Sequence, residues 1–207
     1  MRRRFTTGAC MGTAFCASVG VAVLALAAFG TGSTGVRRGL DLTARFSFLL
    51  FWLAYSGSAL AALFGSAFGP VAKRGRDFGL AFASAHLVHV GLVVWLYWIS
   101  VRPPVSESTF IFFGIGVIWT YLLALFSIRR LAQILDPLRW RLLRTIGLEY
   151  IAFAFLVDFA NHPLHWNAKS LLFYLPFATL GVTGTMLRIL ASTRRWQATM
   201  ARRALPL

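Results

Sequence analysis

Acidic residues, and charged residues in general, are scarce in this sequence. Of 207 residues only 6 are Asp or Glu, against 21 Lys or Arg, and charged residues make up 13% of the chain. Soluble domains carry about 25% charged residues. With 58% hydrophobic residues and a mean hydropathy of +0.70, the composition predicts a membrane protein that forms a single transmembrane domain over residues 1–207.

Several motifs that support catalysis are also missing. The sequence has no phosphate-binding glycine loop, no Gly-x-Ser-x-Gly elbow and no Cys-x-x-Cys pair. Its two cysteines, Cys10 and Cys16, lie near the predicted cytoplasmic end of the first apolar run, where we expect no disulfide. Nothing resembles a soluble flavin or nicotinamide domain. A redox role would therefore require a redox partner protein or a membrane quinol as electron donor.

Six apolar runs predict an all-α membrane protein, a six-transmembrane-helix bundle, because about 20 apolar residues cross the hydrocarbon core of a bilayer. The fifth run is long enough only when it is counted from Leu142. Residues 191–207 follow the last run as a basic tail. The predicted spans are 13–30, 46–68, 78–99, 110–127, 142–160 and 170–190.

The positive charges predict the orientation of this bundle. If the N-terminus is cytoplasmic, 16 of the 21 Lys and Arg residues lie on the cytoplasmic side and 5 on the other. Positive residues gather on the cytoplasmic side, so both termini and the tail are predicted to be cytoplasmic. The same charges flank apolar runs and form no soluble basic domain. This argues against nucleic acid as a partner, despite the net charge of +15, and favours the lipid bilayer.

Two histidines lie within the apolar run 78–99. His86 and His89 are three residues apart and share one face of a helix. A titratable side chain at membrane depth is costly, and its presence there indicates a functional site. His86 and His89 are therefore the first candidates to ligate a metal.

The segment from Lys73 to Trp98 has a recognisable order: a basic cluster, Gly-Leu, aromatic and small residues, then an apolar residue and a His. It resembles the third helix of ferric-reductase-like transmembrane domains, especially the YedZ type, the haem-binding membrane subunit of a periplasmic methionine-sulfoxide reductase system. This resemblance implies a b-type haem bound by helix-borne histidines and electron transfer across a bacterial inner membrane. The matching positions are Arg74, Arg76, Gly79, Leu80, Phe82, Val88 and His89.

The fifth predicted helix departs from the resembled family. Where the family has two histidines, this sequence has Arg144 and the neighbouring residues Val157 and Asp158. Iron held by two imidazoles needs ligands from two facing segments. Beyond the pair in the third helix, the only histidines are His162 and His165, in the predicted outer loop.

With these few histidines, at most one b-type haem of the resembled kind is expected. Its iron would be held by His86 or His89, and by His162 or His165 if the outer loop enters the bundle. The arginines at the predicted inner face, Arg74, Arg76 and Arg144, could hold haem propionates through charge-assisted hydrogen bonds.

The acids in the fifth helix offer another interpretation. Glu149 and Asp158 are nine residues apart and face roughly opposite sides of the helix. Asp158 could pair with His89 and relay protons, or it could be a polar clamp between helices. Glu149 lies near the cytoplasmic interface, where we expect it to reach a basic residue.

Two main functions follow from these patterns. The chain could be a membrane-embedded electron-transfer subunit, the membrane part of an oxidoreductase, with one haem. It could instead be a haem-free membrane subunit that keeps the fold for a structural or partner-binding role. A proton pathway through Asp158 and Glu149 is a third interpretation.

Overall fold

The computed structural model describes residues 2–127, 131, 136–161 and 168–204, and most of these residues are helical. The long helices are α1 (Arg2–Phe29), α2 (Ser33–Phe64), α4 (Gly75–Ile99), α5 (Glu107–Phe126), α7 (Pro137–Asn161) and α8 (Ala168–Ala204). A short 3-10 turn, Ser66–Phe68, and the helix α3 (Gly69–Lys73) connect α2 to α4.

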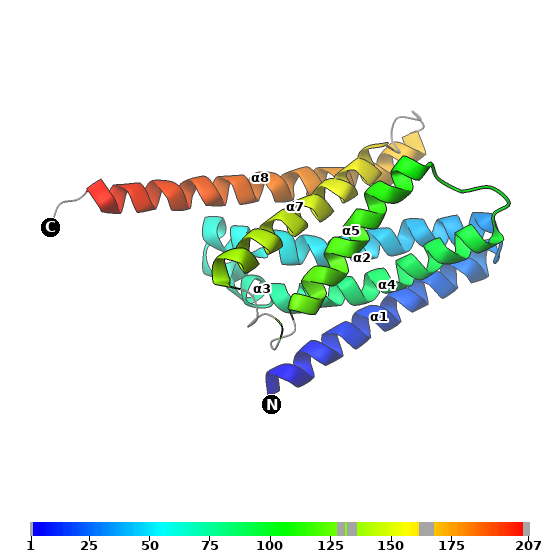
Figure 1. Ribbon diagram of the computed structural model, residues 1–207, viewed down its shortest axis with the longest axis horizontal. Coiled ribbons are helices and arrows are strands. Elements are labelled where there is room, and N and C mark those ends of the chain that lie inside the picture. Colours follow the sequence, from blue (N-terminus) through cyan, green and yellow to red (C-terminus); the bar gives the residue numbers. More distant parts are fainter. Residues whose placement is uncertain (1, 128–130, 132–135, 162–167, 205–207) are drawn as a thin grey trace.

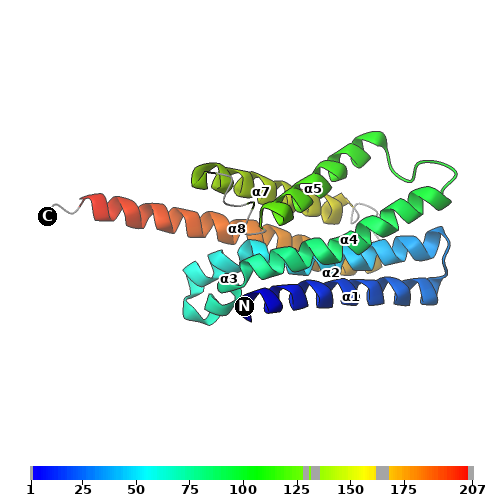
Figure 2. The same cartoon turned by 60° about the horizontal axis from the view of Figure 1, so that its bottom comes forward.

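The helices form two groups (Figures 1 and 2). Helices α1, α2 and α4 lie side by side and contact one another extensively, and α5 packs mainly against α7. Helix α8 contacts both α2 and α7, so it joins the two groups. It also projects beyond the other helices at the end that holds α3 (Figure 1), which we call the inner end; the end with the α1–α2 turn is the outer end.

Five of the described helical segments are long and apolar enough to cross a membrane. The sixth predicted span, 142–160, falls within α7, which is helical but is not among them. Five charged residues in this helix explain its lower hydropathy: Arg139, Arg141, Arg144, Glu149 and Asp158. The five segments are Thr7–Phe29, Ser33–Phe64, Gly75–Ile99, Glu107–Phe126 and Phe173–Ala198.

Helix ends differ from the predicted spans because helices continue past apolar runs. The predicted span 46–68 begins thirteen residues after the start of α2, since the residues between form helix although they include three arginines. The helix ends earlier than predicted, at Phe64, because Gly65 adopts a φ of +83°, which glycine tolerates best. Much of the predicted tail 191–207 continues α8 as far as Ala204.

A layer of aromatic side chains joins the two groups of helices. Phe48 and Phe51 on α2 pack against Phe155 on α7, with ring centroids 5.2 and 5.6 Å apart. Phe82 on α4 lies 5.3 Å from Phe51, and Phe159 on α7 lies 5.0 Å from Phe48. These five rings are almost fully buried, so they form the main core.

Small residues bring α4 close to α1. Ala81 and Ala85 on α4 are completely or almost completely buried. Ser18 on α1 donates a hydrogen bond to the Ala85 carbonyl at 3.0 Å, and Ser84 on α4 donates one to the Met11 carbonyl, also at 3.0 Å. Small residues and hydroxyl groups are the usual means by which helices pack closely in a bilayer. The position of α4, and thus of its histidines, is fixed by these contacts.

Candidate functional site: the histidine pair on α4

His86 and His89 form one cluster inside the bundle. Their rings are stacked, with centroids 5.1 Å apart and an angle of 14° between the ring planes. His86 also lies 5.3 Å from Phe82 and 6.3 Å from Phe155. Both histidines therefore lie against other helices: His86 points towards α7, and His89 lies against α2.

Thr43 on α2 determines the tautomer of His89. The Thr43 hydroxyl donates its one hydrogen to the Gly39 carbonyl, at an oxygen–oxygen distance of 2.7 Å. Its oxygen lies 3.2 Å from Nδ1 of His89. Because the hydroxyl hydrogen is already used, Nδ1 of His89 is the donor in this contact.

This assignment leaves Nε2 of His89 with its lone pair. Metal-binding histidines commonly donate one ring N–H to a hydroxyl or carbonyl oxygen while the other nitrogen binds the metal. His86 adds a second imidazole beside it. Its Nδ1 is buried and has no hydrogen-bond partner among the described residues. Nδ1 of His86 is thus a buried nitrogen that no hydrogen bond from the described residues uses.

His86 or His89 could supply one imidazole ligand to a haem iron. The second imidazole of the pair could not serve as the other ligand, since both rings are stacked on one helix and iron held by two imidazoles needs ligands from two facing segments. Across from His86, the described side chains are aromatic, with Phe155 the nearest on α7. The described part of the chain also holds no cluster of three or more His, Cys, Asp or Glu that could bind a metal. His162 and His165, the other predicted ligands, lie outside the described residues.

The predicted propionate-binding arginines lie away from the histidines. Arg74 and Arg76 are exposed at the start of α4, and ten residues, about 15 Å of helix, separate Arg76 from His86. Arg76 donates a hydrogen bond to the Ser127 carbonyl at 3.0 Å, at the end of α5. Arg144 on α7 is close enough to Arg188 on α8 to interact electrostatically. The structure does not bring these three arginines together with the histidine pair.

Glu149 belongs to a separate cluster that clamps α2, α7 and α8. Its Oε1 accepts hydrogen bonds from Arg188 Nη2 at 2.7 Å and Nε at 3.0 Å. Its Oε2 accepts one from the Tyr55 hydroxyl at 2.6 Å. Glu149 thus reaches a basic residue, as expected from the sequence, but the partner is on α8 and the contact is an ion pair between helices. With its carboxylate so occupied, it has the properties of a clamp.

Asp158 also lies apart from His89. It is close enough to Tyr174 on α8 to act on it electrostatically. The hydrogen bond and the ring contact that His89 makes with described side chains are to Thr43 and His86. Asp158 therefore belongs to the α7–α8 side of the bundle.

Thr43, Tyr55 and Arg188 are the important residues that the sequence analysis missed. Tyr55 and Arg188 could have been found by searching the other predicted helices for polar residues at the same distance from the cytoplasmic end as Glu149. Two further hydroxyl groups that could have bound an imidazole bind backbone carbonyls instead: Ser84 donates to Met11, and Tyr150 donates to Phe112 at 2.9 Å. No pattern in the sequence indicates the contact between Thr43 and His89.

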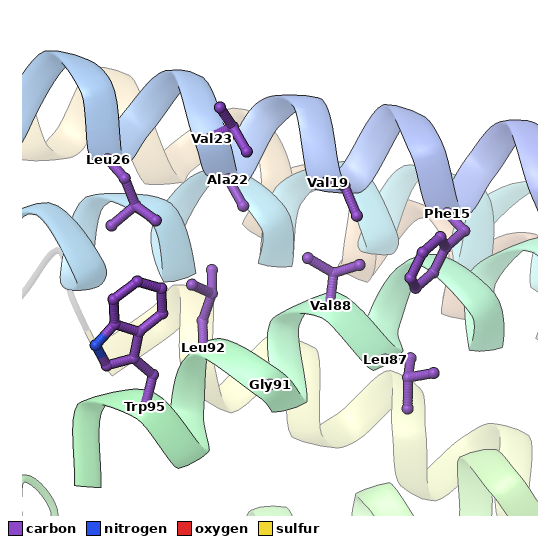
Figure 3. Close-up of a pocket in the computed structure, with 10 residues that line it drawn as sticks. All are labelled: Phe15, Val19, Ala22, Val23, Leu26, Leu87, Val88, Gly91, Leu92 and Trp95. Atoms are coloured by element: carbon purple, nitrogen blue, oxygen red, sulfur yellow. The ribbon is translucent and has the colours of Figure 1, made fainter. Parts of the chain in front are cut away.

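The side of α4 next to α1 is apolar. Figure 3 shows an open hollow between these helices, with Phe15, Val19 and Leu26 on α1 above Leu92 and Trp95 on α4. Its lining contains no histidine and almost no polar surface. The histidine pair is therefore not part of this hollow.

Comparisons of the chain with known protein families, curated proteins and solved structures found no match.

Proposed function

We propose that this chain is a membrane-embedded electron-transfer subunit of the ferric-reductase-like type that holds one b-type haem through an imidazole of α4. The observation that carries the proposal is the orientation of His89: its Nδ1–H is used by Thr43, and its Nε2 lone pair remains. A haem held there supplies one-electron chemistry. The chain would provide an imidazole ligand from His89, the orienting hydroxyl of Thr43 and an aromatic surrounding that excludes water.

The proposal includes the topology inferred from charge. The chain crosses a bacterial inner membrane six times, with α7 as the fifth span and both termini cytoplasmic. Both ends of the described chain point towards the inner end of the bundle, which supports an even number of crossings (Figure 1). Reporter fusions at Val105 and Asp136 should report the outside and the cytoplasm, and the reverse pattern rejects this orientation.

The haem is tested by the absorption spectrum of the purified full chain, expressed with haem supplied. We expect a Soret band and b-type bands after reduction with dithionite. His89→Ala should lose them. Leu87→Ala, which removes an exposed side chain from the same helix turn, is the matched control and should keep them. Absence of the Soret band from the wild-type protein rejects the proposal.

A second candidate is a haem-free subunit that keeps the fold in order to bind a partner protein. The aromatic layer favours it, because Phe82 and Phe155 pack directly against His86 in the space that faces α7. In that case His86 and His89 are buried polar groups whose contacts fix the rotation of α4 against α2. The same spectrum distinguishes the two functions.

A further inference from the structure

Arg45 on α2 is a buried cation within a helix that is long and apolar enough to span a membrane. From the sequence, the loop between the predicted spans 13–30 and 46–68 contains three arginines, Arg37, Arg38 and Arg45. In the structure only 6% of the surface of Arg45 is exposed. An ionised side chain removed from water is costly unless partners compensate for the lost hydration. The surroundings of Arg45 therefore need an explanation.

Aromatic rings of α8 cover the guanidinium. Its central carbon lies 3.9 Å from the ring centroid of Phe173, 4.5 Å from that of Tyr174 and 5.6 Å from that of Phe177. A desolvated cation over an aromatic face gains about 2 kcal/mol. These rings stabilise the positive charge, but they accept no ordinary hydrogen bond from the N–H groups at the edge of the guanidinium.

The hydrogen bonds of Arg45 are incomplete. Nη1 donates to the Asp41 carbonyl, whereas Nε and Nη2 are buried and make no hydrogen bond of normal geometry to the described residues, although the Tyr174 hydroxyl lies close to the guanidinium. The nearby Asp41 carboxylate is used by other groups: the Tyr174 hydroxyl donates to Oδ1 at 3.3 Å, and Arg38 lies 3.9 Å from Oδ2. Nε and Nη2 together form the planar fork that binds oxyanions with two parallel hydrogen bonds.

The position of Arg45 suits a ligand from the outer leaflet. Arg38, which is exposed, and Asp41 lie nearer the outer end of α2, and Arg45 follows Asp41 by one helical turn, about 6 Å. The cover on this side is Phe173, whose surface is 42% exposed. Phe173 is thus the part of this cover that a ligand arriving from the surface of the bundle would have to displace.

We propose that Arg45 binds a phosphate group between α2 and α8 at the outer end of the bundle. The phosphate belongs either to the headgroup of an anionic phospholipid or to free inorganic phosphate. It accepts hydrogen bonds from Nε and Nη2 and neutralises the buried charge. This site is separate from the histidine pair and does not depend on haem.

The test is thermal unfolding of the delipidated full chain in neutral detergent, with added phosphatidylglycerol, phosphatidylcholine or inorganic phosphate. Arg45→Gln removes the fork, and Arg38→Gln is the matched control on the same helix. For the wild type and Arg38→Gln we expect the midpoint to rise with the concentration of phosphatidylglycerol, because a ligand that binds only the folded state stabilises it. A weaker rise with phosphatidylcholine identifies the anionic headgroup as the ligand. An equal rise with inorganic phosphate identifies the free anion.

The Gln variant distinguishes this site from a general effect of lipid. Without added ligand, Arg45→Gln should be at least as stable as the wild type, because it removes a buried charge. With ligand, its midpoint should not rise. A rise equal to that of the wild type, or no rise in the wild type with any of the three additives, overturns the proposal. If Arg45→Gln does not insert into the membrane, Arg45→Lys replaces it, because lysine keeps the charge but lacks the planar fork. If ligand raises the unfolding midpoint of Arg45→Lys as much as that of the wild type, the proposal is equally overturned.

Discussion

The two groups of helices are held together by different forces. Of the residues in the most apolar stretch of each helix, 44% in α2, 39% in α4 and 22% in α1 are buried, against 11% in α5 and 11% in the joining helix α8. The α1–α2–α4 group relies on small side chains and hydroxyl-to-backbone hydrogen bonds. The second group, α5 and α7, is attached to the first through the large aromatic rings of the core, and to α8 through the ion pair of Glu149 with Arg188.

This difference assigns separate roles to the two groups. Close backbone packing leaves little freedom for α4 to rotate, so the first group can hold an imidazole in one orientation. The second group presents most of its apolar surface outward, towards lipid or a partner protein, and its charges tie it to α2. We infer that changes in the first group disturb the site most, whereas changes in the second mainly affect attachment.

The largest effect is expected from enlarging a residue between α1 and α4. Ala85 is fully buried, so Ala85→Leu has no space and should lower the free energy of unfolding by about 3 kcal/mol, the upper range for an overpacked core. Unfolding in mixed detergent micelles measures this change. Gly91→Ala on the same helix is the control: a Cβ there has no atom within 4 Å, and we expect little change. Equal effects of the two substitutions would contradict the tight packing of this group.

A smaller effect is expected from the ion pair that ties α7 and α8 to α2. Arg188→Ala leaves the Glu149 carboxylate with only the Tyr55 hydroxyl and should cost about 2 kcal/mol. A fully buried pair would cost more, but the Glu149 side chain is 44% exposed. The same unfolding measurement applies. A double-mutant cycle with Glu149→Gln should give a coupling well above zero, and additive effects would show that the pair contributes nothing.

The smallest change in stability is expected at Thr43. Thr43→Val removes the oxygen that accepts from His89 Nδ1 and should cost about 1 kcal/mol, the typical net value of one hydrogen bond. Haem affinity should fall by about 10- to 100-fold, as for other residues that orient a metal ligand. Haem titration of the detergent-purified protein measures this. Thr43→Ser keeps the hydroxyl and should behave like wild type, and a Ser variant as weak as Val would contradict the orienting role.

The sequence predicts which segments are helical better than it predicts which side chains of different helices contact each other. Apolar runs indicate which segments are helical, because backbone groups in lipid must bond within their own segment. They do not indicate where a helix continues beyond its apolar run, as α2 does between Ser33 and Arg45. The contact of Thr43 with His89 joins residues 46 positions apart and depends on the rotation of two helices. Hydropathy also treats Arg45 as a loop residue, because it does not register the aromatic rings of α8 that cover it.

The most direct test of the account is the haem content of the purified full chain, measured by the reduced pyridine haemochrome after expression with haem supplied. The account predicts one haem per chain in the wild type and in Leu87→Ala, and none in His89→Ala when that variant is inserted and folded. A wild-type protein that is folded and holds no haem would contradict the electron-transfer proposal and favour the haem-free subunit.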